Sequence, residues 1–110
     1  MAGYFTLFQS EKNQEWYFNL KAGNHETILQ SEGYKAKTSA ENGIASVQKN
    51  SPEDARFERK QNEKGHFWFL LKATNGQTIG MSEMYNSAAG RDKGIESVKL
   101  NGKSETIKEK

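Results

Sequence analysis

Two Ser-Glu pairs are the residues whose chemistry is closest to that of a nucleophilic enzyme. Ser31 precedes Glu32, and Ser82 precedes Glu83. A nucleophilic serine needs a general base within hydrogen-bonding reach. Adjacent residues of a strand point to opposite faces, so neither glutamate faces its serine, and no histidine is placed as a base. We therefore expect both serines to be structural, and we predict that the chain is not an enzyme and has no catalytic residues.

Metal and cofactor chemistry has equally little support in the sequence. The chain has no cysteine, and its two histidines, His25 and His66, share no zinc-binding spacing. The glycines near residues 64–65 and 75–77 lack the spacing and the following helix that hold phosphate groups. We expect ordinary surface histidines, ordinary turns, no metal site and no cofactor.

Length and composition describe a small, polar, folded protein. The chain has 110 residues, with 16 basic against 14 acidic residues, and 11% of its residues are aromatic. This length favours a single domain over residues 1–110. The opening MAGYFTLFQS has no basic start and only a short apolar run, and no stretch approaches the roughly 20 apolar residues of a membrane helix. Together with the lack of cysteine, this favours a soluble cytoplasmic protein with no membrane partner.

An internal repeat organises the chain. When the sequence is shifted by 51 positions, residues 16–50 align with residues 67–101, and 15 of these 35 positions are identical. Two units therefore fill the chain, one over about residues 4–54 and the other over about residues 55–110. A unit of this size is marginal as an independent domain. We expect the two units to share one hydrophobic core.

Each unit begins with strands. Aromatic-rich runs at residues 16–22 and 67–73 have the composition of strands, and residues 27–31 and 78–82 return as second strands. Shorter strands are expected at residues 5–8 and 56–60, before each hairpin. The pair Asn75-Gly76, and less well Asn24-His25, indicates a type I′ turn with two positive φ angles. A last short strand is expected at residues 104–109.

A helix follows each hairpin, because the apolar period changes from two to about 3.6. The apolar face of the first contains Ala40, Ile44 and Val47, and the second has Arg91, Ile95 and Val98 at the same positions. The helices are expected to start with a capping box (Thr38, Glu41) and an N-cap (Ser87), and to end in left-handed residues (Asn50, Asn101). Gly43 and Gly94 lie mid-helix, which predicts a close backbone approach there. Tyr34 and Tyr85 are expected to fill the junction between sheet and helix.

The runs NLKAGNHETILQSEGY (residues 19–34) and LLKATNGQTIGMSEMY (residues 70–85), with the helices ENGIASVQKN and DKGIESVKLN, resemble the YegP-like family of small bacterial proteins. The resemblance covers nearly the whole chain. It implies an α+β fold of two tandem β-β-β-α(-β) repeats that form one mainly antiparallel sheet with two helices packed on it, their last strands exchanged. Residues 104–109 would then cross back to the first repeat, while residues 55–60 close the first unit and open the second. The resemblance implies no activity.

Strand alternation predicts a candidate interaction surface. If Trp16, Phe18 and Leu20 face the helices, the opposite face of the sheet presents Phe8, Tyr17, Trp68 and Leu70. An apolar cluster of this size often marks a partner site. The alternative is that a loop, the crossing strand or a helix covers this face.

Two functions follow from these alternatives. The first is a non-catalytic module that binds an unknown protein partner or a second copy of itself. The second is a weak binder of single-stranded nucleic acid, in which aromatics stack on bases and Lys21, Lys60 and Lys72 meet phosphates. The interleaved acidic residues and the lack of a basic cluster stand against the second. Lys21 and Lys72 are also expected to form cross-strand ion pairs with Glu32 and Glu83.

Overall fold

A computed structural model describes residues 3–110 of the chain. In chain order its strands are β1 (Tyr4–Gln9), β2 (Trp16–Lys21), β3 (Thr27–Ser31), β4 (Phe57–Gln61), β5 (Phe67–Lys72), β6 (Thr78–Met81) and β7 (Ile107–Glu109). Helix α1 (Lys37–Asn50) follows β3, helix α2 (Ala88–Asn101) follows β6, and the 3-10 helix η1 (Asp54–Arg56) precedes β4. None of the helices in this described part of the chain is long and apolar enough to span a membrane.

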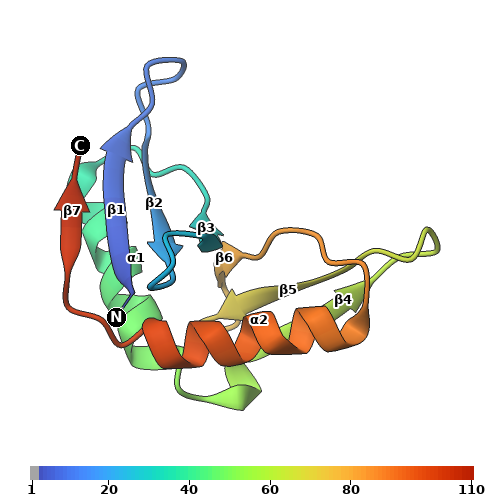
Figure 1. Ribbon diagram of the computed structural model, residues 1–110. Helices are drawn as coiled ribbons and strands as arrows, with labels where there is room; N and C mark the ends of the chain where they lie inside the picture. Colours follow the sequence, from blue (N-terminus) through green and yellow to red (C-terminus); the bar gives the residue numbers. More distant parts are fainter. Residues whose placement is uncertain (1–2) are drawn as a thin grey trace.

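All seven strands belong to one sheet, in the order β4-β5-β6-β3-β2-β1-β7. The two repeats meet at its centre, where β3 pairs with β6, and every pairing is antiparallel except that of β7 with β1. Figure 1 shows the strongly twisted sheet with a helix beside each half. The predicted α+β class, with two tandem β-β-β-α units in a mainly antiparallel sheet, is confirmed.

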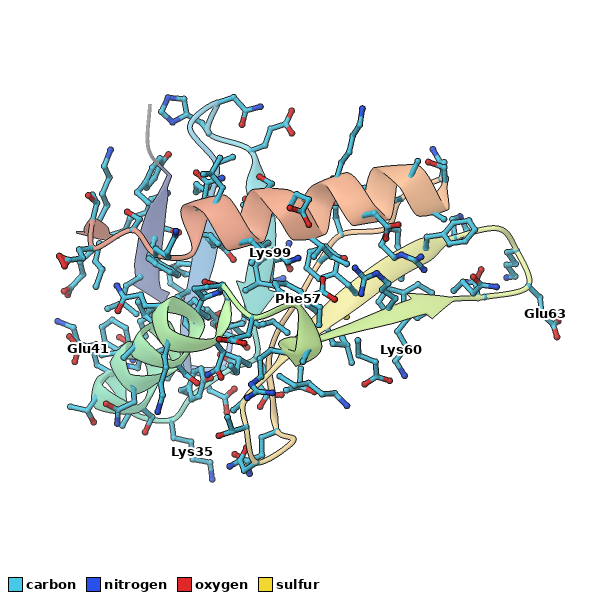
Figure 2. The ribbon with its side chains drawn as sticks, turned by 90° about the horizontal axis from the view of Figure 1, so that it is seen from below. Lys35, Glu41, Phe57, Lys60, Glu63 and Lys99 are labelled. Atoms are coloured by element: carbon cyan, nitrogen blue, oxygen red, sulfur yellow. The ribbon has the colours of Figure 1, made fainter. Side chains whose placement is uncertain are left out.

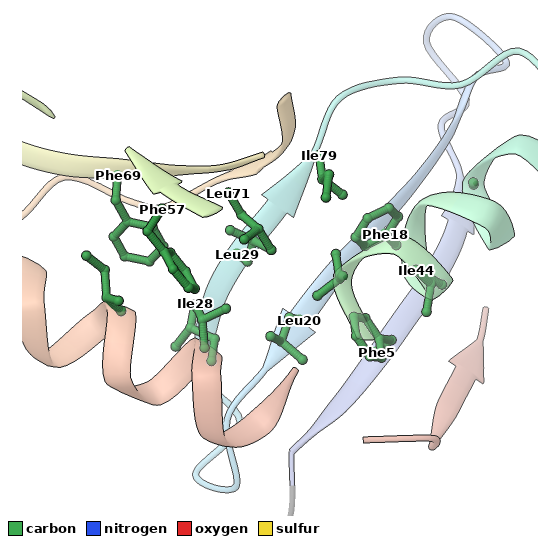
Figure 3. Close-up of a cluster of buried hydrophobic side chains, with 14 of the residues drawn as sticks. Phe5, Phe18, Leu20, Ile28, Leu29, Ile44, Phe57, Phe69, Leu71 and Ile79 are labelled. Atoms are coloured by element: carbon green, nitrogen blue, oxygen red, sulfur yellow. The ribbon is translucent and has the colours of Figure 1, made fainter. Parts of the chain in front are cut away.

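Both helices pack on the same face of the sheet and join the two repeats. Helix α1 contacts β1 and β2 of its own repeat and also β5 and β6 of the other, while α2 contacts β5 and also β2 and β3. The buried side chains form one cluster (Figure 3). Its largest fully buried members are Phe5, Leu7, Phe18, Leu20, Leu29, Ile44, Phe69, Leu71 and Ile95. One core is therefore shared between the repeats, as the short units predict.

The two tyrosines fill the junction of sheet and helix as predicted. Tyr34 stacks on Phe18 with ring centroids 6.3 Å apart, and Tyr85 stacks on Phe69 at 6.5 Å. Each hydroxyl lies against a helical glycine, so that a Cβ built on Gly43 would lie 2.7 Å from the Tyr34 Oη. Burial raises the pKa of both tyrosine hydroxyls, and a nearby glutamate raises it further. The mid-helix glycines are thus explained by the close approach of a ring.

The last strand crosses back to the first repeat, as the resemblance implies. The backbone N–H of Phe5 donates to the carbonyl of Thr106 at 2.9 Å, and the N–H of Lys110 donates to the carbonyl of Leu7 at 2.9 Å. An ion pair of 2.7 Å between Lys37 and Glu109 ties β7 to α1. The C-terminal strand β7 therefore pairs with the outer edge of β1, although the two strands lie at opposite ends of the sequence.

The hairpin turns differ from the expected type. Positive φ occurs at His25 (71°) and Gly76 (85°) but not at Asn24 or Asn75. The backbone N–H of Ala22 donates to the carbonyl of Glu26, and the second copy repeats this bond. Both loops therefore have three residues, the last of them left-handed, instead of the two-residue type I′ turn.

Three of the four expected helix ends are also wrong. The residue before α1 is Ala36, which makes no side-chain cap, so Thr38 and Glu41 form no capping box. Asn50 and Asn101 remain inside their helices, where each side-chain amide donates to the carbonyl four residues earlier at 2.8 Å. Only the cap at Ser87 is confirmed: its Oγ accepts from the N–H of Gly90 at 2.9 Å. Hydrogen bonds inside the helix replace the left-handed ends.

Candidate interaction surface

The far face, by which we mean the face of the sheet opposite the helices, carries the predicted surface residues. On its first half, the antiparallel register places Phe8 directly opposite Tyr17. Their rings stack with centroids 5.9 Å apart and planes inclined by 20°. Asn13 in the preceding loop donates its side-chain N–H to the Tyr17 Oη at 2.9 Å. Both aromatic side chains are half-buried.

The second half of the far face holds the other two predicted residues. Trp68 lies opposite Lys60, and Leu70 lies between Glu58 on one side and Met81 on the other. Trp68 and Leu70 are half-buried, whereas Met81 is 44% exposed. Met81 was missed by the sequence reasoning because its counterpart in the first repeat is Gln30; alternation along β6 gives only its face, and the pairing of β5 with β6 places it beside Leu70.

The register places the four predicted residues in two groups, separated by a polar strip. Between the two groups Asn19 pairs with Gln30, and Gln30 pairs with Met81. A shallow groove of about 340 Å³ runs along the strip beside Leu70, and another of about 310 Å³ runs beside Tyr17. Gln30 and Ser31 line both grooves. The far face is therefore apolar at two places and amide-lined between them.

Among residues 3–110, no helix or strand lies over the far face. Both helices contact the opposite face, and β7 lies at the edge of the sheet beside β1 (Figure 1). The sequence left open that a helix or the crossing strand covers the far face. Within residues 3–110, neither does.

A charged group borders the second half of the far face. Glu58 forms an ion pair with Lys60 at 2.9 Å and another with Lys72. Hydrogen bonds from Lys72 and Lys60 lower the pKa of the Glu58 carboxyl below its ordinary value. The expected pair of Lys72 with Glu83 is wrong, because β4 on the outer side of β5 brings Glu58 closer to the lysine.

The serines of the two Ser-Glu pairs make hydrogen bonds to the backbone of the sheet. Ser31 Oγ accepts the backbone N–H of Phe18 at 2.9 Å and donates to the carbonyl of Glu32 at 2.9 Å. Ser82 makes the same two bonds, with Phe69 and Glu83, at 3.0 and 2.8 Å. Each hydroxyl thus replaces a backbone group where the second strand leaves its partner.

The two histidines lie at two different hairpins. The Tyr4 hydroxyl lies 2.8 Å from His25 Nδ1 at the first hairpin turn, and His66 lies just before β5. Over residues 3–110, no group of three or more metal-binding side chains comes together. These positions add no chemistry to the candidate surface.

Comparison with known proteins places these features in a family. The family described as "Domain of unknown function (DUF1508)" matches the chain twice, over residues 11–58 and 62–109. The UPF0339 protein YegP of Escherichia coli K12 is 57% identical over 99% of this chain and 98% of its own length. A UPF0339 protein of Acinetobacter baylyi is 56% identical over 99% of this chain and 97% of its own length.

Two solution NMR structures have the same fold. That of yegP from E. coli, a protein of unknown function, superimposes with a TM-score of 0.92 at 55% identity, covering 99% of this chain and 93% of the other. That of a UPF0339 protein from Shewanella oneidensis gives a TM-score of 0.93 at 50% identity, covering 99% and 92%. The resemblance inferred from the sequence motifs is confirmed.

Proposed function

This chain belongs to the DUF1508 family, whose description assigns no function, and we propose that it is a cytoplasmic, non-catalytic module that binds a protein partner through the far face. The observation that carries the proposal is a pair of apolar groups, Phe8 with Tyr17 and Leu70 with Trp68 and Met81, on a sheet face over which no helix or strand of residues 3–110 lies. Grouped apolar side chains at a surface commonly mark interaction sites.

The chemistry of the far face indicates the kind of partner. Aromatic and methionine side chains are enriched in protein interfaces, and here Tyr17 and Met81 supply them on either side of the strip. Asn19 and Gln30 between them offer both donors and acceptors. A partner that matches this face presents two apolar contacts with hydrogen-bonding groups between them, as a flat protein surface or an extended peptide does.

The non-catalytic part of the proposal rests on the hydroxyls. Ser31 and Ser82 have both their accepting and their donating capacity engaged by the backbone. Activation as a nucleophile would require a base to accept the hydroxyl proton, in place of the carbonyl of Glu32 or Glu83 that accepts it here. The relatives reported above carry no enzymatic name, which agrees with this part of the proposal.

A second candidate, binding of single-stranded nucleic acid, is favoured by one observation. Lys60 lies directly opposite Trp68, so a base stacked on the indole would have an ammonium group close to its phosphate. Glu58 opposes this function, because its carboxylate engages both Lys60 and Lys72. The protein-binding proposal is therefore the stronger one.

Photo-crosslinking in cells tests the proposal. We expect a photoreactive phenylalanine analogue placed at Tyr17 or at Trp68 to give a discrete adduct with one protein. The same probe at Glu41, which is exposed on α1, is the matched control and should give none. Met81→Lys should abolish the adduct, since it adds an ammonium group to the apolar contact. Adducts that form equally from Glu41, or that disappear after nuclease treatment, contradict the proposal.

A further inference from the structure

The sheet has two edges, and the chain completes them differently. On the first repeat, β7 occupies the outer side of β1. On the second repeat, β4 is the counterpart of β1. It is the last strand in the order of the sheet, and no strand of residues 3–110 lies beyond it. Figure 2 shows β4 beyond β5, with Phe57 at its start and Lys60 on the side away from α2. The outer edge of β4 is therefore open.

Backbone hydrogen bonds show which groups of β4 point outward. The N–H of Asn62 donates to the carbonyl of His66, which makes this pair a hydrogen-bonded one. Such pairs alternate along an antiparallel ladder, so Lys60 and Glu58 bond to β5. Arg59 and Gln61 then point their N–H and C=O groups away from the sheet. The residues opposite them on β5 support this assignment. Phe67 and Phe69 direct their backbone hydrogen bonds away from β4, to Tyr85 and Ser82.

The start of β4 limits the length of the open edge. The N–H of Phe57 donates to the carbonyl of Asp54 in η1 and is therefore engaged. The carbonyl of Phe57 has no such restriction. The outward groups are thus the carbonyl of Phe57 and both the N–H and the carbonyl of Arg59 and of Gln61. This set is symmetric about Arg59, except that the N–H of Phe57 is engaged by Asp54.

The side chains on β4 match an antiparallel copy of themselves. If two β4 strands pair about a twofold axis at Arg59, Glu58 of each lies opposite Lys60 of the other. Glu58 and Lys60 are already 2.9 Å apart within the chain, so the four charges would alternate in sign around a square on the far face. Opposite charges directly across a pair of strands are stabilising. An edge with a single sign of charge would instead repel its copy.

The remaining like-charge contact in this arrangement is neutralised within each chain. Arg59 of one copy would lie opposite Arg59 of the other on the helix side of the sheet. Its guanidinium donates to Asp54 at 3.2 Å and to Asp92 at 3.3 Å. The hydrogen bond that Arg59 donates to Asp54 is the largest cause of a raised pKa of the guanidinium, and the two carboxylates offset its charge toward a neighbour.

We propose that a second copy of this chain pairs with the open edge of β4, antiparallel and centred on Arg59, so that the two sheets become one. Such a contact is isologous and closes at two copies. It also places the two far faces side by side, which enlarges the surface available to a partner. The proposal stands on the edge of β4 and does not depend on the far face being a binding site.

Charge reversal with rescue tests the proposal. Sedimentation equilibrium of the full chain over increasing concentration should show a monomer and dimer in exchange. Glu58→Lys or Lys60→Glu alone should weaken the dimer about tenfold or more, since each turns two attractive contacts into repulsive ones. The double variant Glu58→Lys/Lys60→Glu restores alternation and should dimerise as the original chain does. Glu41→Lys, a charge reversal at an exposed position of α1 away from β4, is the matched control and should leave the dimer intact.

Three results would overturn the proposal: a chain that remains monomeric at millimolar concentration, a double variant as weak as the single ones, or a dimer that the control Glu41→Lys also abolishes. Because Glu58→Lys also removes the pair with Lys72, circular dichroism must show that each variant is folded. A second measurement needs no variant. The Arg59 amide should exchange its hydrogen quickly in dilute solution and become protected at high concentration, and an exchange rate independent of concentration would also overturn the proposal.

Discussion

A chain divided before η1, into residues 1–53 and 54–110, is expected to give two fragments that are unfolded when separate and fold when mixed. Each fragment lacks part of its core. The first loses β7 from the edge of β1, and α1 loses its contacts with β5 and β6; the second loses the contacts of α2 with β2 and β3. Units of about 50 residues are marginal even with a complete core.

Circular dichroism and thermal unfolding check this expectation. The intact chain should unfold in one cooperative transition, as expected for the single domain that we propose over residues 1–110. The mixed fragments should recover the spectrum of the intact chain. A fragment that shows its own cooperative transition, or an intact chain with two separate transitions, would contradict a shared core. A chain cut instead within the β1–β2 loop at residues 11–13 serves as a control for the break itself.

Gly94→Ala is expected to lower the free energy of unfolding by about 1–3 kcal/mol, the range typical of overpacked cores. Helix propensity alone predicts a gain of about 1 kcal/mol for this substitution in mid-helix. The new Cβ would lie 2.8 Å from Cζ of Tyr85 and closer still to its hydroxyl oxygen. Tyr85 cannot easily retreat, because its ring stacks on the fully buried Phe69. Steric conflict therefore outweighs propensity.

A double-mutant cycle isolates this conflict. Tyr85→Phe removes the hydroxyl oxygen nearest to the new methyl group, so Gly94→Ala should be less destabilising in the Tyr85→Phe background than in the original chain. Gly43→Ala, its counterpart in the first repeat, should behave alike because Tyr34 Oη occupies the same position. Chemical denaturation measures all of these values. A stabilising effect of Gly94→Ala would contradict the packing described for α2.

Features repeated in both halves of the sequence could be predicted, because each pattern occurs twice and the two occurrences support the same structural assignment. The apolar period of the helices, the positions of the hairpins and the tyrosines at the junction all recur at a separation of 51 residues. The crossing of the last strand came only from the family resemblance. Nothing in residues 104–109 indicates on its own that they pair with β1.

Details set by single residues or by long-range register could not be read from the pattern. One left-handed residue, His25 or Gly76, determines a three-residue turn, and the short loop is compatible with either turn type. The division of the far face into two groups depends on the pairing of β3 with β6, which brings Gln30 beside Met81. That contact joins residues 51 positions apart in the sequence. Local alternation gave the face of each residue, not its neighbours on that face.

If the apolar side chains of the far face serve binding, as we propose, they contribute little to the stability of the core. Leu70 and Leu71 allow one direct comparison, because they are adjacent in β5 and Leu71 is fully buried under the helices while Leu70 is half-buried on the far face. In chemical denaturation, Leu71→Ser should lower the free energy of unfolding by roughly 3 kcal/mol or more, and Leu70→Ser by less than about 1 kcal/mol. Equal losses for the two variants would show that the far face is packed like a core, and would contradict a binding role for its apolar side chains.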